Sequence, residues 1–447
     1  MWRRKTGERT PMIDIPPPPE NPLELESWLA SFTNWEKQLP LGKEKRELGP
    51  TRCRRLLDRA QLDTRGTRVF QIAGSKGKGS TVLWLETLLS ERGLSVGATT
   101  SPHLHSLEER IRIQQQPVPF QRLLKALKTL YPALLAGQSL GDPTPTFFDL
   151  WTVLFIQLAL EEKCEVILLE VGLGGPLDST TAIPHDVGIL TTVDLEHREL
   201  LGDTIEEIAA EKSKISRSGF PFVISQGQHQ KTALEIAEEK RALPILAKLD
   251  SRIPDSVPTH QKINASAALA ALEVGDIYQA WSKEEVQQAW DLLELPGRLE
   301  IIPGDPPLLL DGAHTPASMA AFAEAFQKRR KSGDDEASTK GAIVLGMLSD
   351  KEPLLTLQHL LDLEPFPDIC TLTVPTKRGL SAEELAEVLK SMLNNEIAHH
   401  SIHIAKDPES AQEWLIKKAA IGEPIAATGS MYLAGLVRNS WLDRNQA

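Results

Sequence analysis

A glycine-rich segment, 74–81 (GSKGKGST), places lysine and hydroxyl side chains between an apolar run and a helical pattern. Glycines in such a turn let backbone N–H groups face one concavity, and a helix N-terminus adds positive potential. Lys78 can then contact terminal phosphates, while Ser80 or Thr81 can cap the helix or approach Mg²⁺. The strict Walker pattern is absent because Gly79 separates Lys78 from the hydroxyl. The strand–loop–helix context nevertheless favours nucleotide binding over a plain glycine turn with a serine cap.

Further polar residues follow other apolar runs. Glu170 ends the run 166–169, and an acid at the carboxyl end of a buried parallel strand lies where ligands bind in open α/β sheets. It is a candidate Mg²⁺ ligand, or else a cap of the next turn. His197 follows a third run, although a single histidine is more often structural than a ligand. Asp311 and His314 (DGAH) form a loop that can contact ribose or phosphate, or can simply cap a helix.

The elements that must position these groups alternate along the chain. Short apolar runs alternate with helical patterns, which predicts mainly parallel sheets covered on both faces. In the first half, the sequence predicts strands at 69–73, 166–171, 187–193 and 220–225 and a helix at 80–92. In the second half, it predicts strands at 308–311, 342–346, 369–374, 401–405 and 424–428, and helices at 316–330, 381–393 and 408–420.

This pattern predicts an α/β protein in three parts. Residues 1–22 include four consecutive prolines and are expected to be a flexible or polyproline lead-in. Residues 23–296 are expected to form a P-loop-type parallel-sheet ATPase domain. Residues 297–447 are expected to form a smaller Rossmann-like α/β domain.

Composition excludes several classes of function. The 447 residues contain 49 Lys plus Arg against 61 Asp plus Glu, and the net charge of −12 argues against nucleic acid or an anionic membrane as a partner. The three cysteines are far apart in sequence, which makes a disulfide framework or a zinc site improbable and fits a reducing cytoplasm. The longest apolar stretch is shorter than the ~20 residues that span a bilayer.

Together, these segments resemble the folylpolyglutamate synthase/dihydrofolate synthase family, a branch of the Mur ligases. The resemblance covers residues 45 to 438, and its motifs occur in the family's order, which makes it specific. The matching motifs are AGSKGKGST (73–81), TSPHL (100–104), ERIRI (109–113), TFFD (146–149), LEVGLGGPLDST (169–180), DLEHRELLGDT (194–204), IAAEKSKI (208–215), PGRLE (296–300), LLLDGAH (308–314) and TGSMYLAG (428–435).

The resemblance implies an ATP-dependent acid–amino-acid ligase of the tetrahydrofolate synthase or dihydrofolate synthase type. Such an enzyme adds L-glutamate to folate, with dihydropteroate as a second acceptor. In the family's chemistry the acceptor carboxylate attacks the γ-phosphate of ATP, and the glutamate amine then displaces phosphate from the acyl phosphate. The expected cofactors are ATP and Mg²⁺, and the expected partners are folate or dihydropteroate and L-glutamate. We expect a cytoplasmic monomer.

The same resemblance assigns site residues motif by motif. The expected ATP-binding residues are Gly77, Lys78, Gly79, Ser80, Asn264, Arg298 and Asp311. The expected metal ligands are Ser101, Glu170 and His197, and the expected substrate-binding residues are Phe147, Phe148, Asp149 and Asp178. The expected catalytic residues are Lys78, Lys212 and His314, where Lys212 matches the family lysine that becomes a carbamate. From spacing alone, Lys212 would be assigned to an i,i+4 ion pair on an acidic helix.

Some positions depart from the family's pattern. Pro176 stands where the family has an arginine beside the pterin-bearing substrate, and proline removes both the charge and a backbone donor. Asp149 replaces glutamate, Thr315 replaces asparagine, and Lys214 replaces a glycine close to Lys212. These changes leave the ATP chemistry in place and leave the acceptor open among dihydropteroate, reduced folates and both.

Other functions remain as alternatives. One is another Mur-type amide ligase that acts on a non-folate carboxylate. A peptidoglycan-precursor ligase would need a further nucleotide-sugar domain, for which the 72 residues before Ala73 leave little room. A non-catalytic nucleotide-binding protein is disfavoured because Lys78, Glu170, His197 and Lys212 are all present.

Overall fold

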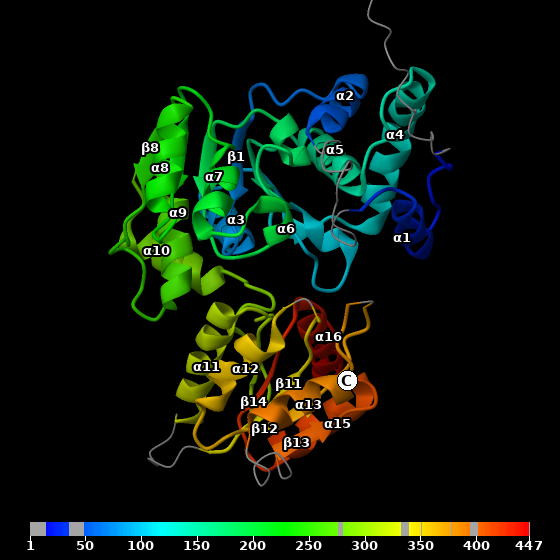
Figure 1. Ribbon diagram of the computed structural model, residues 1–447. Coiled ribbons are helices and arrows are strands. Elements are labelled where there is room, and N and C mark those ends of the chain that lie inside the picture. The colour runs from blue at the N-terminus through cyan, green and yellow to red at the C-terminus, as the bar shows by residue number, and fades with distance from the viewer. Residues whose placement is uncertain are drawn as a thin grey trace, which may run out of the picture. The chain divides into compact units, whose positions relative to one another are not determined.

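The computed structural model describes residues 15–34, 49–275, 280–331, 339–349, 351–376, 378–393 and 401–446. These residues form two compact units, each built on its own sheet (Figure 1). Unit 1 holds the described residues up to His103 together with Leu107–Leu293, and unit 2 holds Leu104–Ser106 and the residues from Glu294 onward. The domain bounds 23–296 and 297–447 stay predictions.

The sheet of unit 1 has eight strands among the described residues, in the order β4-β3-β2-β5-β1-β6-β7-β8. All neighbours pair in parallel except β2 with β3 and β3 with β4. The strands are β1 (Arg68–Ala73), β2 (Val96–Thr99), β3 (Ile111–Ile113), β4 (Gln116–Pro117), β5 (Val166–Glu170), β6 (Val187–Leu190), β7 (Pro221–Ile224) and β8 (Leu243–Leu246). The predicted parallel sheet is therefore confirmed.

Helices cover both faces of this sheet (Figure 1). One face packs against α3 (Lys78–Glu91), α9 (Thr259–Val274) and α10 (Lys283–Leu292). The other face carries α1 (Pro22–Ala30), α2 (Thr51–Arg59), α4 (Phe120–Ser139), α5 (Phe147–Glu161), α7 (Ile205–Ser213) and α8 (Gln230–Glu239). The remaining described turns of helix in this unit are η2 (Leu107–Arg110), η3 (Ser179–Ala182) and α6 (Arg198–Leu201).

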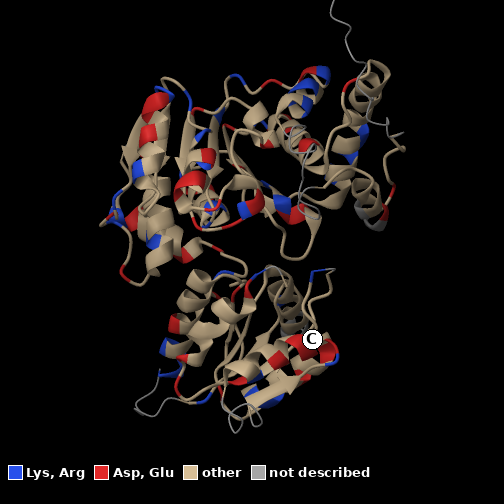
Figure 2. Ribbon diagram, viewed as in Figure 1, with Lys and Arg blue, Asp and Glu red and all other residues tan. Residues whose placement is uncertain are grey.

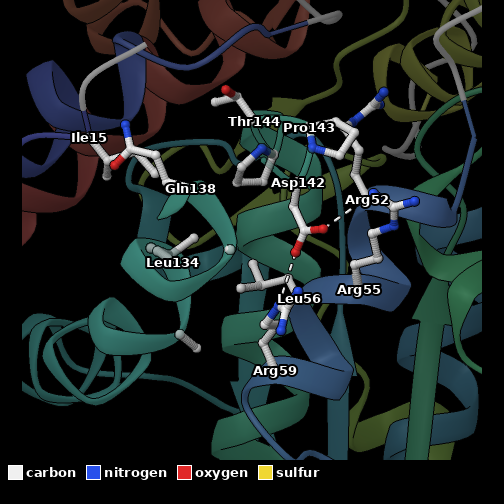
Figure 3. Close-up of a pocket in the computed structure, with 13 residues that line it drawn as sticks. Ile15, Arg52, Arg55, Leu56, Arg59, Leu134, Gln138, Asp142, Pro143 and Thr144 are labelled. Atoms are coloured by element: carbon white, nitrogen blue, oxygen red, sulfur yellow. Dashed lines mark hydrogen bonds and ion pairs between the residues drawn. The ribbon is translucent and has the colours of Figure 1, made fainter. Parts of the chain in front are cut away.

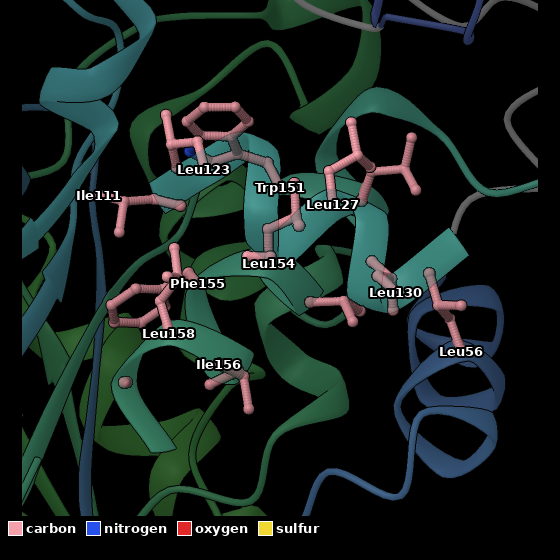
Figure 4. Close-up of a cluster of buried hydrophobic side chains, with 14 of the residues drawn as sticks. Leu56, Ile111, Leu123, Leu127, Leu130, Trp151, Leu154, Phe155, Ile156 and Leu158 are labelled. Atoms are coloured by element: carbon pink, nitrogen blue, oxygen red, sulfur yellow. The ribbon is translucent and has the colours of Figure 1, made fainter. Parts of the chain in front are cut away.

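The apolar runs form strands because both of their faces are buried. In β1, Val69 packs on the α5 side while Phe70 and Ile72 pack on the α3 side. In β5, Ile167 and Leu168 divide between the same two faces. Near-continuous apolar sequence is what a parallel strand covered on both sides requires. Figure 4 shows the core beneath α5, in which Trp151, Leu154, Phe155 and Leu158 of α5 meet Leu123, Leu127 and Leu130 of α4.

Part of the N-terminal segment is held by hydrogen bonds. Ile15 is buried, and its carbonyl accepts a hydrogen bond from the Tyr131 hydroxyl over 3.2 Å. The Trp28 indole N–H donates to the Pro16 carbonyl over 2.9 Å. Of the two alternatives for the lead-in, these contacts favour an ordered polyproline segment over a flexible one at Ile15 and Pro16, and the lead-in as a whole stays a prediction. Residues 1–14 lie outside the described part of the chain.

Unit 2 contains a six-stranded sheet among its described residues, in the order β13-β12-β11-β14-β10-β9, with only β9 antiparallel to its neighbour. Its strands are β9 (Glu300–Ile302), β10 (Leu308–Leu310), β11 (Ala342–Leu345), β12 (Asp368–Thr371), β13 (Ile402–Ile404) and β14 (Ile425–Thr428). Its helices are α11 (Pro316–Arg330), α12 (Pro353–Leu361), α13 (Ala382–Met392), α15 (Pro408–Ala420) and α16 (Met431–Gln446). The helices α15 and α16 pack on one face, and α11, α12 and α13 pack on the other.

The helices of both units carry mixed charges, and their lengths and apolar content can be compared with those of membrane-spanning helices. Figure 2 shows lysine and arginine interspersed with aspartate and glutamate over the helices of both units. Among the described residues, no helix is both long and apolar enough to cross a membrane.

Candidate active site

The segment between β1 and α3 forms the predicted phosphate-binding loop. Gly77 is the N-cap of α3 and has a left-handed backbone with φ of 85°. A Cβ atom on Gly77 would lie 2.1 Å from Oδ1 of Asn264, and one on Gly74 would lie 1.9 Å from Oγ1 of Thr191. Both positions therefore require glycine, because neighbouring side chains occupy the space that a Cβ atom would take. Lys78, Gly79 and Ser80 form the first turn of α3, where unpaired N–H groups favour an anion.

Two lysines converge on this loop. Lys78 Nζ and Lys212 Nζ each donate to the carbonyl oxygen of Gly74 over 3.0 Å. Lys212, which lies on α7 and is 2% exposed, also forms an ion pair of 2.9 Å with Oε1 of Glu196. Burial lowers the pKa of Lys212, and the neighbouring Lys78 charge lowers it further, whereas Glu196 opposes the shift. Burial disfavours ionisation of Glu196, yet the charges on Lys212 and Lys78 hold its pKa below the usual range.

The predicted metal ligands follow strands of the same sheet. Glu170 is the last residue of β5 and is 5% exposed, and its Oε2 accepts a hydrogen bond from the Ser101 N–H over 2.8 Å. The structure thus brings Ser101 and Glu170 together beyond β2 and β5. His197 is the N-cap of α6, with φ of 47°, and it follows Glu196. Parallel pairing puts the carboxyl ends of β2, β5, β1 and β6 at one edge, which is where α/β sheets bind ligands.

This donor set fits Mg²⁺ bound together with a nucleotide. It offers one carboxylate, one hydroxyl and one imidazole, and the described residues contain no group of three or more His, Cys, Asp or Glu side chains that could hold a metal. Magnesium usually keeps several waters and binds one or two carboxylates plus substrate phosphates. A site beside the phosphate loop suits that preference better than an all-protein cage would.

Two of the predicted substrate residues, Phe148 and Asp178, contact the backbone of the loop 171–178. The Phe148 ring lies against Gly172, because a Cβ on that glycine would be 3.0 Å from Cε1 of the ring. Oδ2 of Asp178 accepts the N–H groups of Gly172 and Leu173 over 3.0 Å each, and its Oδ1 accepts from Thr180. Asp178 is buried, which raises its pKa. Its carboxylate therefore holds the loop together.

The other two predicted substrate residues lie deeper. Phe147 is 4% exposed, and its ring stacks on Trp151 with centroids 5.9 Å apart. Asp149 is fully buried and forms a capping box with Thr146 at the start of α5. Phe148 is the half-buried member of the predicted set, while Phe147 belongs to the core beneath α5.

Unit 2 carries the three remaining predicted residues. Asp311 follows β10, and its Oδ2 accepts the Leu299 N–H over 2.7 Å. Loss of hydration raises the pKa of Asp311 to about 6, although the Leu299 N–H and the Arg298 charge oppose this shift. His314 Nδ1 lies 2.7 Å from the carbonyl oxygen of Gly312, which orients the imidazole. Arg298 lies next to Leu299, so one turn carries both the arginine and the N–H that binds Asp311.

Comparisons with known proteins place this chain in a family. The family model described as "Mur ligase, glutamate ligase domain" matches residues 297–431. The dihydrofolate synthase/folylpolyglutamate synthase of Escherichia coli (strain K12) is 30% identical over 400 residues, which span 86% of this chain and 87% of the relative. The chain belongs to the folylpolyglutamate synthase/dihydrofolate synthase family. It is accordingly an ATP-dependent ligase.

Other members extend the likeness to the whole described fold. The corresponding protein of Bacillus subtilis (strain 168) is 27% identical over 429 residues, covering 87% of this chain and 94% of the relative. A Yersinia pestis structure with AMPPNP and a Mn ion has a TM-score of 0.80 at 27% identity, over 96% of this chain and 100% of that chain. An E. coli FolC structure with DHPP and ADP has a TM-score of 0.77 at 26% identity, over 96% and 99%. The α/β fold class is confirmed.

Sequence reasoning missed three residues that contact predicted site residues. Gln261, on α9, donates to Ser80 Oγ over 3.3 Å and accepts from Asn264 Nδ2 over 3.2 Å, so it links two predicted nucleotide residues. The sequence did offer a signal for Gln261, because a residue three positions before Asn264 lies on the same face of a helix. Glu196, next to His197, pairs with Lys212, and Arg52 forms a 2.9 Å ion pair with Asp149. Neither pair has a sequence signal, because 16 and 97 positions separate the partners.

Proposed function

We propose that this protein ligates L-glutamate to a reduced folate, with dihydropteroate as a second acceptor, and consumes ATP through an acyl phosphate. The observation that carries the proposal is the phosphate loop, in which Lys78 and the first turn of α3 lie beside Glu170 and Lys212. Family membership supplies the acceptor class, because members are named for folylpolyglutamate and dihydrofolate synthesis.

The chemistry requires positioning and charge stabilisation more than a protein nucleophile. The acceptor carboxylate attacks the γ-phosphorus, the bond to the β-bridging oxygen breaks, and ADP leaves. The glutamate amine then attacks the acyl carbon and releases phosphate. In both steps negative charge develops on phosphate oxygens, so Lys78 and the N–H groups of Gly79 and Ser80 stabilise the reaction where charge grows.

Ser101, Glu170 and His197 would hold Mg²⁺, and the ion would neutralise phosphate charge. Glu170 is suited to this role because its carboxylate lies at the sheet edge and is oriented by the Ser101 N–H. Lys212 is proposed as the carbamate-forming lysine. Its burial and lowered pKa favour the neutral amine that reacts with CO₂, and Glu196 already fixes the position of its Nζ.

The acceptor would lie along the loop 171–178 with its aromatic part beside Phe148. Asn264 of unit 1, and Arg298, Asp311 and His314 of unit 2, are proposed nucleotide and catalytic contacts. The proposal takes residues 23–296 as the ATP-binding domain and 297–447 as the C-terminal domain.

We further propose that the protein works as a cytoplasmic monomer without nucleic-acid or membrane partners. The three cysteines, all within the described residues, are buried and unpaired, which suits a reducing compartment. The net charge of −12 disfavours polyanionic partners.

The test uses purified protein with ATP, Mg²⁺ and L-glutamate, and either dihydropteroate or tetrahydrofolate as acceptor. Release of ADP and product mass are followed together. One added glutamate on dihydropteroate indicates dihydrofolate synthase activity, and successive additions to tetrahydrofolate indicate the polyglutamate synthase. If neither acceptor gains glutamate while another carboxylate does, the folate assignment is wrong and only the ligase class remains.

A further inference from the structure

A second carboxylate, besides that of Asp178, lies close to the loop 171–178, here called the acceptor loop. Asp149 Oδ2 accepts hydrogen bonds from Arg52 Nε over 2.9 Å and from Thr146 N and Oγ1 over 2.8 Å each. Its Oδ1 accepts from Ser179 Oγ over 2.7 Å. The Asp149 side chain is 0% exposed and that of Arg52 is 13% exposed. A carboxylate with donors on both oxygens and no exposed surface is committed to the protein, so Asp149 is not placed to touch a substrate.

These bonds connect α2 to the loop 171–178. Ser179 directly follows Asp178, whose carboxylate binds the N–H groups of Gly172 and Leu173. The connection therefore runs from Arg52 through Asp149 and Ser179 to Asp178 and the loop backbone. Because the Asp149 carboxylate is fully buried, as are its bonds to Thr146 and Ser179, loss of the Arg52 charge leaves it unpaired instead of solvated.

We propose that Arg52 and Asp149 are positioning residues for the acceptor substrate. Their ion pair fixes Ser179 and Asp178, and these fix the strip of backbone at Gly172 against which the Phe148 ring lies. This inference rests on the proposed function for the identity of the acceptor. The bracing of the loop itself depends only on the contacts above.

Neighbouring arginines provide a matched control. α2 carries several arginines (Figure 2), and Figure 3 shows Arg52, Arg55 and Arg59 along the small pocket between α2 and the end of α4. Arg55 and Arg59 pair with Asp142, over 3.2 and 2.9 Å, on the side of that pocket. Arg55 thus shares the helix, the charge and an aspartate partner with Arg52, but its partner belongs to the segment after α4 instead of to α5.

The experiment compares Arg52→Met with Arg55→Met in the full-length protein. Loss of one charge-assisted hydrogen bond corresponds to about a tenfold change in an equilibrium. We expect KM for the folate acceptor to rise about tenfold in Arg52→Met, with KM for ATP changing less than about twofold. Arg52→Lys, which keeps the charge, should recover part of the loss. The inference is overturned if Arg55→Met has the same effect, or if KM rises equally for ATP and acceptor.

A milder variant covers the possibility that Arg52→Met does not fold. Ser179→Ala removes one hydroxyl and leaves the ion pair in place, and we expect it to raise the acceptor KM in the same direction. An unchanged acceptor KM in Ser179→Ala would contradict the connection through Ser179.

Hydrogen exchange separates this inference from the proposed function. In Arg52→Met the amide N–H groups of Gly172 and Leu173 should exchange faster than in the parent protein, whatever the acceptor is. If the parent protein glutamylates no folate, the proposed function fails. Faster exchange at these two amides in Arg52→Met would still show that Arg52 and Asp149 hold the loop 171–178 in place. Unchanged exchange at both amides would overturn the inference that Arg52 and Asp149 are positioning residues.

Discussion

Lys78 and Lys212 donate hydrogen bonds to the same atom, the carbonyl oxygen of Gly74, over 3.0 Å each. One lysine belongs to the first turn of α3 and the other to α7, so this oxygen joins the phosphate loop to the helix that precedes β7. Two ammonium groups on one oxygen repel each other, and Glu196 offsets part of that repulsion. Carbamate formation on Lys212, as proposed, would remove this repulsion and leave Lys78 as the positive charge for phosphate oxygens.

Removing the Lys78 charge should abolish turnover and leave the fold intact. We expect Lys78→Ala to lose at least about a hundredfold in kcat, because a charge contact to the transferred phosphoryl group is worth several kcal/mol in the transition state. ADP release by the folded variant is the measurement, and Lys231→Ala on α8 controls for the loss of one surface charge. Near-normal ADP release would refute the assigned role of Lys78.

Glu170→Ala and His197→Ala should each raise the Mg²⁺ concentration needed for half-maximal activity, because each removes a proposed ligand. Glu165→Ala is the matched control, since Glu165 lies at the amino end of β5, where it accepts a hydrogen bond from the Ser95 N–H. An unchanged Mg²⁺ titration would remove the substituted residue from the metal site.

Gly77→Ala should weaken nucleotide binding more than backbone strain alone explains. The new Cβ would lie 2.1 Å from Oδ1 of Asn264, at a φ of 85°. Gly93 has a similar φ of 78°, and a Cβ added there would meet nothing within 4 Å, so Gly93→Ala carries only the strain, roughly 1–2 kcal/mol. The comparison is made by ADP titration and thermal unfolding. Equal losses of ADP affinity and of thermal stability in the two variants would show that the contact with Asn264 is unimportant.

The buried His185 should make the fold sensitive to acid. Burial, together with the charges of Arg217 and Lys240, lowers its pKa to about 3 from 6.5. The folded state thus resists a proton that the unfolded state accepts, so stability is complete above pH 6.5 and falls as the pH drops toward 3. At pH 5 the loss from this residue is about 2 kcal/mol. His185→Gln should flatten the pH dependence of the unfolding free energy in urea between pH 7 and pH 5; an equally steep dependence would assign the effect to other groups.

Local signals predicted much of the fold. The bounds of α11 and α15 agree with the sequence prediction, because each helix begins with a proline after a capping residue, Thr315 or Asp407. The helix predicted from residue 80 instead begins at Lys78, since Gly77 takes the N-cap position and Ser80 lies within the first turn. Antiparallel β3 and β4 are three and two residues long, too short to leave a periodic pattern.

The site was less predictable than the fold. The resemblance assigned Phe147, Phe148, Asp149 and Asp178 to the substrate, but whether a carboxylate faces a substrate or the protein depends on partners far away in the chain. Asp149 is the clearest example, because Arg52 and Ser179 lie 97 and 30 positions away from it. Burial decides such roles, and burial is a property of the folded state.

Strand β8 ends the larger sheet, and its hydrogen-bonding direction limits what can join it. Leu243 and Ala247 donate inward, to the carbonyl oxygens of Phe220 and Ile224. Pro244 therefore occupies an outward position and has no N–H to offer, which leaves Leu246 as the outward amide donor of the strand. A neighbouring molecule that approached this rim would find too few donors to continue the ladder, despite the exposed leucines. The rim is thereby protected against edge-to-edge aggregation.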